Sequence, residues 1–316
     1  MTHILVATSD GLHTIGDRAG VDLAGRDVTA LARGRAGWWA IVDEGVVLRG
    51  APGAVWEEVA VADTRLTCLV VSSHGVFCGT ADARLLHLLD GRLEAVEAFD
   101  DVAGRDAWYT PWGGPPATRS LSCHSDGTLY VNIHVGGIVR SGDGGRTWEP
   151  TLDIDLDVHE VRVEAPTGWV VAATGAGGFA LSEDGGDSWW LTDEGLHGGY
   201  CRAVAVAGAA VLLSASTGPR THRGGVYRRA LEGDGPFERC RQGLPEWFEG
   251  NVDTGWLDAA GDLVALAAPA GSGEPPQTAG GRATSGELYL SDDAGGTWQL
   301  VAEDLPPVRT VAVEPI

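Results

Sequence analysis

The chain has 316 residues, and its 22 basic residues face 44 acidic ones, which gives a formal net charge of −22. No lysine occurs, so every basic residue is an arginine. Such an excess of negative charge argues against the basic patches that nucleic acids and anionic membranes require, so we expect neither as a partner.

The N-terminal residues Met1 to Val6 enter a strand-like pattern at once and show no basic and apolar leader. No apolar run approaches the roughly 20 residues that a membrane-spanning helix needs. Five cysteines are an odd number in a long chain, which argues against a disulfide framework. These features predict a cytoplasmic protein with reduced, mostly buried thiols.

Short apolar runs separated by glycine-rich turns recur along the chain, and each unit has the pattern of four strands. Four-stranded units of about 40 residues are typical of β-propeller blades. Residues 4–15 lack a first strand and residues 308–314 supply one, so together they complete a seventh unit. We therefore predict an all-β fold: one seven-bladed β-propeller domain over 1–316, with four-stranded antiparallel blades and a ring closed by the C-terminal strand joining the N-terminal blade. The predicted blades are 308–316 with 1–24, 27–62, 65–99, 117–151, 157–195, 200–243 and 251–305.

One eight-residue motif, S-x-D-x-G-x-[TS]-W, occurs in three near-perfect copies. Its Ser and Asp oxygens can accept backbone N–H bonds within a tight turn, its Gly can adopt a positive φ, and its Trp can pack beneath the turn. The motif therefore predicts a structural turn. Its residues are Ser141, Asp143, Gly145 and Trp148, then Ser182, Asp184, Gly186 and Trp189, then Ser291, Asp293, Gly295 and Trp298.

This motif resembles the Asp-box, or BNR repeat, of sialidases, sortilin-type receptors and photosystem assembly factors. The resemblance implies a sialidase-like propeller, related in form to WD40 and YVTN repeats, with the turn on the face opposite the ligand site. True sialidases have six blades and an Arg-Ile-Pro-like motif near the N-terminus, which this chain lacks. The resemblance is therefore closer to the sortilin and assembly-factor branches, and it implies binding of a ligand or protein without catalysis.

The start of each first strand should lie at the rim of a propeller's central channel. Aligning the apolar alternation of these strands puts one ionisable residue per blade at the rim: Asp27, Arg65, Arg119, His159, Arg202, Asp253 and Arg309. Four guanidinium groups would concentrate positive charge and suit a small anionic ligand. The alternative is that polar residues simply occur where a wet channel meets solvent.

Long loops fall on the same face, at 100–116, 194–200, 216–223, 244–248 and 270–285. Loops on one side of a rigid scaffold are common places for binding residues. Trp108, Tyr109, Trp112 and Trp247 could stack on a sugar or contact a protein. The sequence thus leaves open a small anionic or carbohydrate-like ligand, or a protein partner. The alternative is that these aromatic side chains only hold their own loops in place.

Four histidines, His134, His159, His197 and His222, are also expected on this face. If they converged they could hold a divalent metal, although no close ligand spacing supports this; otherwise we expect no cofactor. The chain shows no G-x-S-x-G motif, P-loop or dinucleotide-binding motif. A glycosidase-like hydrolase or a lyase, if the protein is an enzyme, would draw its catalytic groups from His159, Glu160, Tyr200 and Asp253.

Overall fold

The computed structural model describes residues 3–17, 19–270 and 285–314. Its backbone divides into two compact units. Unit 1 comprises Met1–Asp27, Gly175–Phe179 and Thr192–Ile316, and unit 2 comprises Val28–Thr174 and Ala180–Leu191. The prediction of one domain stays a prediction. No helix within the described ranges is long and apolar enough to cross a membrane.

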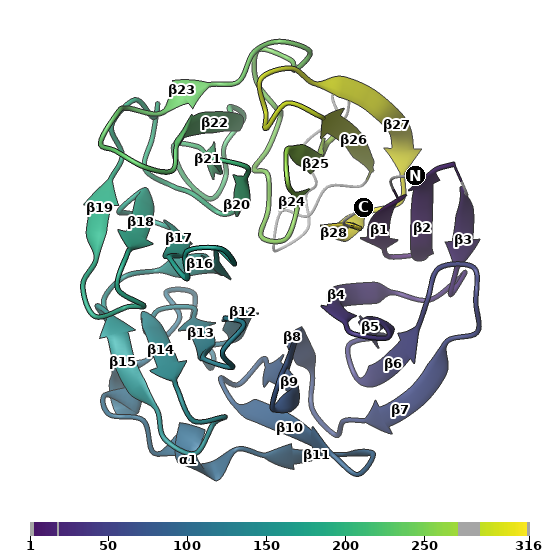
Figure 1. Cartoon of the computed structure of the whole chain (residues 1–316), viewed down its shortest axis with the longest axis vertical. Coiled ribbons are helices and arrows are strands. Elements are labelled where there is room, and N and C mark those ends of the chain that lie inside the picture. Colours follow the sequence, from purple (N-terminus) through teal and green to yellow (C-terminus); the bar gives the residue numbers. More distant parts are fainter. Residues whose placement is uncertain (1–2, 18, 271–284, 315–316) are drawn as a thin grey trace. The chain divides into compact units, whose positions relative to one another are not determined.

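Three four-stranded antiparallel sheets belong to unit 1 (Figure 1). The first has the strand order β28-β1-β2-β3, and the other two follow the chain order. Their strands are β1 (His3–Thr8), β2 (Gly11–Gly16), β3 (Gly20–Asp22), β20 (Val204–Ala207), β21 (Ala210–Ala215), β22 (Gly225–Ala230), β23 (Glu238–Arg239), β24 (Leu257–Ala260), β25 (Leu263–Pro269), β26 (Gly286–Ser291), β27 (Gln299–Leu305) and β28 (Val308–Val313).

Four further sheets of the same kind belong mainly to unit 2, with two short helices, α1 (Glu97–Asp100) and a 3-10 turn (Arg105–Ala107). Their strands are β4 (Val28–Gly34), β5 (Gly37–Val42), β6 (Val46–Gly50), β7 (Glu57–Val61), β8 (Leu66–Ser72), β9 (Gly75–Thr80), β10 (Leu85–Leu89), β11 (Arg92–Ala95), β12 (Thr118–Cys123), β13 (Leu129–Ile133), β14 (Ile138–Ser141), β15 (Glu149–Leu152), β16 (Val158–Val163), β17 (Val170–Thr174), β18 (Phe179–Ser182) and β19 (Trp190–Thr192).

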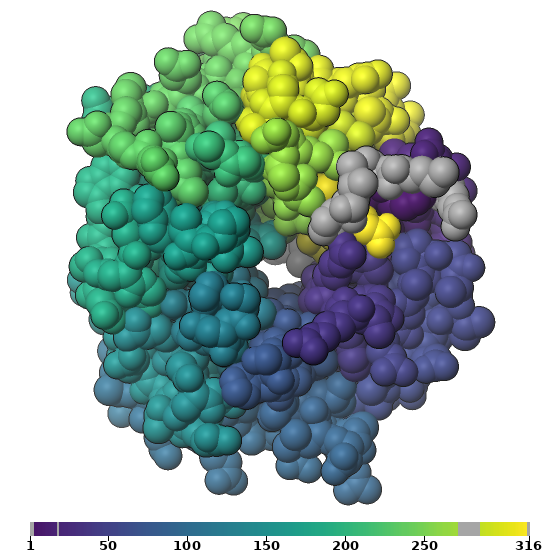
Figure 2. Space-filling view, in the orientation of Figure 1, coloured from purple at the N-terminus to yellow at the C-terminus, as the bar shows by residue number. Residues whose placement is uncertain are grey.

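The two ends of the chain meet within one sheet of unit 1. Strand β28 pairs antiparallel with β1, with Val313 opposite Ile4 and Val311 opposite Val6, and these four side chains are buried. Yellow C-terminal residues accordingly lie against purple N-terminal ones in both views (Figure 1, Figure 2). The predicted all-β fold, a seven-bladed β-propeller closed by its C-terminal strand, is confirmed.

The three S-x-D-x-G-x-[TS]-W motifs form near-identical turns. In the first turn, the hydroxyl of Ser141 accepts the N–H of Gly145 at 2.8 Å, and Asp143 accepts the N–H of Thr147 at 2.9 Å. Hydrogen bonds from Thr147, first from its N–H and then from its hydroxyl, lower the pKa of Asp143 to about 2. The corresponding bonds in the other two turns have lengths of 2.6 to 2.8 Å. The local hydrogen-bonding logic expected from the sequence is therefore present in all three turns.

The tryptophans of these turns differ in burial. Trp298, in unit 1, is only 6% exposed, and its indole N–H donates to the carbonyl of Gly295 at 3.1 Å. Trp148 and Trp189, in unit 2, are half-buried. The expectation of a tryptophan packed fully beneath each turn is therefore met by Trp298 alone among the three, because the two in unit 2 keep part of their rings at the surface.

The first strand of a sheet is the edge strand that begins it, such as β4 or β28. Five of these first strands, β4, β8, β12, β16 and β28, carry a β-bulge at their second residue. In each, the first and third residues oppose adjacent residues of the partner strand, so the second is the additional residue. A bulge changes the direction of a side chain and often occurs beside functional sites. The bulge residues are Thr29, Thr67, Arg119, His159 and Arg309.

Candidate functional site

Two of the bulge residues in unit 2 lie beside the same carboxylate. Nε2 of His159 donates to Oδ2 of Asp157 at 3.1 Å. Nη1 of Arg119 and Nε2 of His134 lie 3.6 and 3.8 Å from Oδ1 of the same residue. These four residues, Arg119, His134, Asp157 and His159, are called the Asp157 cluster below. His159 is 1% exposed, whereas the other three members are partly exposed and reachable from solvent.

The Asp157 carboxylate is electrostatically supported but not fully hydrogen-bonded. Burial alone would raise its pKa, but the hydrogen bond from His159 and the electrostatic interactions with His159, Arg119 and His134 outweigh burial and lower it. Its Oδ1 atom is nonetheless buried and has no hydrogen-bond partner among the described residues. The cluster therefore holds an ionised carboxylate whose buried Oδ1 faces Arg119 and His134 from beyond hydrogen-bond distance.

The aromatic loop 100–116 flanks this cluster. The N–H of Tyr109 donates to the carbonyl of Val135 at 3.1 Å, and the N–H of His134 donates to the carbonyl of Ala117 at 3.0 Å. Both ends of the segment 109–117 are thus tied to the backbone around His134. Tyr109 is 50% exposed and Trp112 is 71% exposed. Large aromatic side chains are therefore displayed at the surface next to the cluster.

Trp108 and Trp247 hold their own loops. Trp108 is buried, packs against Phe99 and carries the Arg105 guanidinium 4.8 Å from its ring centre. Trp247 lies against the His197 ring at 4.6 Å and the Arg239 guanidinium at 4.1 Å. The second interpretation of the aromatic residues, that they pin their loops, thus describes these two, whereas Tyr109 and Trp112 remain free for contact with a ligand.

The four predicted rim residues of unit 1 form two compact ion pairs. Arg309 donates from Nε and Nη2 to the two carboxylate oxygens of Asp27, at 2.8 and 3.0 Å. Arg202 donates to Asp253 at 3.0 Å and to the hydroxyl of Tyr200 at 3.1 and 3.3 Å. Burial opposes the charge of Arg202, but Asp253 and Tyr200 more than offset it and raise the pKa of the guanidinium.

The remaining rim arginine, Arg65 in unit 2, pairs with Glu44 at 2.7 Å. Each of the four arginines expected to attract an anion therefore faces a carboxylate of the chain itself. The carboxylate offsets the charge of each guanidinium, so the arginines do not present the uncompensated positive charge that the sequence suggested. Their role in ligand binding stays a prediction.

Sequence alignment of the first strands missed Asp157 because it mixed two registers. Arg119, His159 and Arg309 occupy the bulge, whereas Asp27 and Arg65 stand two residues before it. Asp157 also stands two residues before a bulge, so it corresponds in register to Asp27. A bulge adds one residue without altering the apolar alternation enough to be visible in one sequence. The signal that could have found Asp157 is its separation of two residues from His159.

The four histidines are divided between the two units. His134 and His159 share Asp157 in unit 2, whereas in unit 1 His197 bonds to the Tyr227 hydroxyl at 2.7 Å and His222 is exposed beside Glu249. Within the described ranges, no group of three or more His, Cys, Asp or Glu side chains is arranged to hold a metal ion. A divalent-metal site formed by all four histidines stays a prediction.

The other catalytic candidates are held in ion pairs or hydrogen bonds. Glu160 is buried and accepts from Arg162 at 2.9 Å, while Tyr200 and Asp253 both bond to Arg202.

The predicted binding loop 270–285 is mostly outside the described residues, which leave out 271–284.

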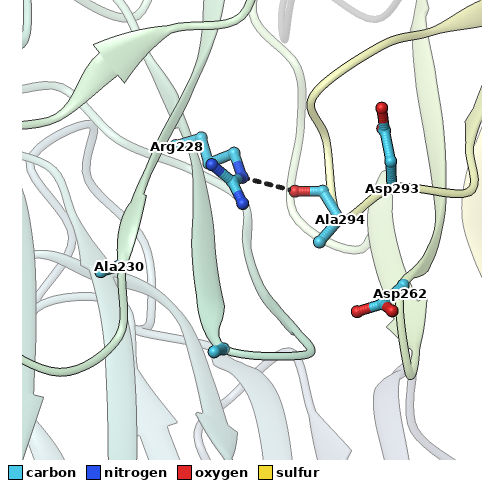
Figure 3. Close-up of a pocket in the computed structure, with 6 residues that line it drawn as sticks. Arg228, Ala230, Asp262, Asp293 and Ala294 are labelled. Carbon is cyan, nitrogen blue, oxygen red and sulfur yellow. Dashed lines mark hydrogen bonds between the residues drawn. The ribbon is translucent and has the colours of Figure 1, made fainter.

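A surface pocket in unit 1 was not expected from the sequence. It has a volume of about 450 Å³ and lies beside the turn that contains Asp293 (Figure 3). Nε of Arg228 donates to the carbonyl of Ala294 at its edge, at 2.7 Å. The pocket is at the end of β20 away from Arg202, because Ala209 follows that strand and Arg202 precedes it. Its lining residues are Ala209, Arg228, Ala230, Asp262, Asp293 and Ala294.

Comparison with known proteins shows the fold and no family. No family model matches the chain. A stretch of 82 residues, 26% of the chain, is 35% identical to the 1-butanol dehydrogenase (cytochrome c) of Thauera butanivorans, and the match spans only 10% of that protein.

Similar solved structures include a xyloglucanase, a lyase and the protein YCF48. The GH74 xyloglucanase from Xanthomonas campestris is 16% identical (TM-score 0.58, covering 95% of this chain and 47% of that one). YCF48 from Cyanidioschyzon merolae is 15% identical (TM-score 0.57, covering 87% of this chain and 84% of that one). The virginiamycin B lyase from Staphylococcus aureus is 11% identical (TM-score 0.59, covering 82% of this chain and 84% of that one). At these identities the likeness shows a β-propeller and leaves the specific function open.

Proposed function

We propose that the chain is a non-catalytic binding propeller that takes up a polypeptide segment of a partner protein on unit 2. The observation that carries the proposal is the exposure of Tyr109 and Trp112 on a loop whose ends are hydrogen-bonded to the backbone on either side of His134. Tyr, Trp and Arg are the residue types that contribute most to binding energy at protein interfaces. This role agrees with the resemblance of the three turns to the Asp-box of sortilin-type and assembly-factor-type propellers.

Charge favours a peptide over a small anion. The four rim arginines are already paired with carboxylates, so an anion would compete with those carboxylates for donors. The net charge of −22 would attract a basic segment and repel an acidic one at long range. We therefore infer a basic polypeptide as the ligand.

Display of random linear peptides tests the proposal without knowledge of the natural partner. Peptides enriched on the purified protein should contain basic residues, and their Kd should be measured by calorimetry. Trp112→Ala should weaken binding at least about tenfold, as loss of a central aromatic contact does. Asp157→Asn should also weaken it, and higher salt should reduce the affinity of the wild-type protein.

Trp190→Ala is the matched control, because Trp190 is an exposed tryptophan of unit 2 on the outer strand β19. Its Kd should equal that of the wild type. Enriched peptides that bind Trp112→Ala and Asp157→Asn with unchanged affinity, or the failure of any peptide to be enriched, would contradict the proposal.

One observation favours a second candidate, a hydrolase or lyase. His134 is partly exposed next to an ionised carboxylate, an arrangement from which an imidazole can transfer protons to a substrate. Turnover of a panel of chromogenic glycosides and esters would be measured for the wild type, His134→Gln and the control His222→Gln. Activity lost only in His134→Gln would support this candidate, and activity equal to buffer in the wild type would end it.

A further inference from the structure

The bulge in β16 leaves a buried carbonyl that a side chain of the neighbouring sheet satisfies. The carbonyl of Val158, just before the bulge residue His159, accepts the side-chain N–H of Asn132 at 2.7 Å. Asn132 lies on β13 and is 0% exposed. A buried carbonyl without a partner is destabilising, so this amide stabilises the bulge.

Asn132 belongs to a buried network that joins three strands. Its Oδ1 accepts from the hydroxyl of Ser120 on β12 at 2.5 Å, and that hydroxyl accepts the N–H of Val161 on β16 at 2.9 Å. A member of the Asp157 cluster lies on β12 and on β16, and another directly follows β13. Ser120 follows Arg119, Asn132 stands two residues before His134, and Val158 lies between Asp157 and His159.

We propose that Asn132 is the positioning residue of the Asp157 cluster: its amide fixes the backbone from which Asp157 and His159 project, relative to the strands of Arg119 and His134. The inference rests on the proposed function in that the cluster is the place where the ligand binds. It assigns Asn132 a role in recognition although its side chain does not reach the surface.

The same position in the other sheets supports this assignment. Asn132 pairs with Ser120, the residue that follows the bulge in β12. In four other sheets, the residue paired with the one after the bulge is Ala7, Ile41, Gly79 or Ala173. A buried amide is unfavourable unless it is bonded, so apolar residues are the usual solution here. The polar residue is present where the following sheet carries one cluster member, His159, at its bulge and another, Asp157, two residues before it.

A serine makes a similar arrangement in unit 1. Ser214 is opposite Ala203, accepts the N–H groups of Ala203 and Arg202, and donates to the carbonyl of Val252, which precedes Asp253. Ser214 thus holds the backbone of the Arg202–Asp253 pair as Asn132 holds the backbone of Asp157 and His159. It provides a matched control in the same chain.

The test compares three variants of Asn132 by two measurements. Asn132→Asp has the same shape but no N–H donor, Asn132→Leu removes both polar atoms, and Asn132→Ser restores a hydroxyl like that of Ser214. The first measurement is the Kd of a peptide selected as described above. The second is the set of imidazole ¹⁵N and ¹H NMR shifts of His159 and His134, which needs no ligand.

We expect Asn132→Asp and Asn132→Leu to weaken peptide binding about tenfold, the change that corresponds to one lost buried hydrogen bond. Both should also shift the His159 imidazole signals, and Asn132→Ser should recover part of both effects. Ser214→Ala should lower the unfolding midpoint yet leave the peptide Kd and the His159 signals unchanged. If the Asn132→Asp and Asn132→Leu proteins do not fold, the Asn132→Ser protein provides the test, because its His159 imidazole signals should still shift from those of the wild type.

Unchanged His159 signals in a folded Asn132→Asp or Asn132→Ser would overturn the inference. Equal changes in Ser214→Ala would overturn it too, because the effect would then be a general loss of stability. If Trp112→Ala binds peptide normally while the His159 signals still respond to Asn132, the proposed function fails and the positioning role stands.

Discussion

Arginine and aspartate meet near the start of a first strand in both units, but with different geometry. In unit 1, Arg309 and Asp27 share two hydrogen bonds of 2.8 and 3.0 Å, so the donors and acceptors of the pair face each other. In unit 2, Arg119 lies 3.6 Å from an oxygen of Asp157 that has no hydrogen bond among the described residues. Similar residue types at similar positions thus produce a closed structural pair in one unit and an incompletely bonded carboxylate in the other.

The largest expected difference between the units concerns the turn tryptophans. Trp298→Ala should lower the free energy of unfolding by about 3–5 kcal/mol, the usual cost of deleting a buried aromatic side chain. Trp148→Ala and Trp189→Ala should cost less, about half as much, because these rings are half-buried and release less apolar surface from water. Urea unfolding of the three variants measures the difference.

Peptide affinity is the control for these three substitutions, because none of the tryptophans belongs to the Asp157 cluster. A Trp148→Ala protein that melts normally but no longer binds peptide would mean that the turn takes part in recognition. Equal destabilisation by all three substitutions would mean that burial does not distinguish the two units.

Double-mutant cycles test the ion pairs directly. We expect a coupling free energy of about 1.5–3 kcal/mol between Arg309 and Asp27, the range of hydrogen bonds to charged groups. The cycle of Arg119 and Asp157 should give less than about 1 kcal/mol, because its atoms are beyond hydrogen-bond distance. The cycles use Arg→Ala and Asp→Asn in each pair, with urea unfolding as the measurement, and a stronger coupling in unit 2 would reverse the comparison.

The fold could be predicted from the sequence because its signals are repeated and local. The motif ending in Trp148 recurs at Trp189 and Trp298, and each copy contains all the donors and acceptors of its own turn. Closure could be predicted as well, since Val308–Val313 has the alternation of a strand but no partner nearby in sequence.

The site could be predicted only in part, because it depends on register between distant strands. Arg119 and His159 were found, but Asp157 was missed, since a bulge shifts the alignment by a residue that no apolar pattern marks. The ion pairs of the rim arginines could not be predicted either. Nothing in the sequence around Arg309 indicates that Asp27, at the other end of the chain, would offset its charge.

Acid titration should reveal a feature that the two units share. Asp143 in unit 2 and Asp293 in unit 1 both have a pKa of about 2, lowered chiefly by the backbone N–H of Thr147 and of Thr297. Because the folded pKa lies below the ordinary value of 3.8, each carboxylate stabilises the fold above about pH 4, and this contribution is lost as the pH falls towards 2.

Unfolding midpoints between pH 5 and pH 2 therefore should fall steeply for the wild type, and less steeply for Asp143→Asn and Asp293→Asn. The two slopes should decrease by the same amount, since both turns have the same bonds. A slope that either variant leaves unaltered would show that the corresponding carboxylate is not stabilised in the folded state.

The smallest effect is expected for Arg65 and Glu44, which form a short pair of 2.7 Å in unit 2 but are 52% and 39% exposed. Solvent screens such a pair and its side chains lose conformational freedom, so the coupling should be only about 0–0.5 kcal/mol. Arg65→Ala should leave the urea midpoint almost unchanged, and added salt should not widen the difference. If the cycle instead gave the coupling expected of Arg309 and Asp27, then distance alone, rather than burial together with paired hydrogen bonds, would determine which rim arginines stabilise this protein.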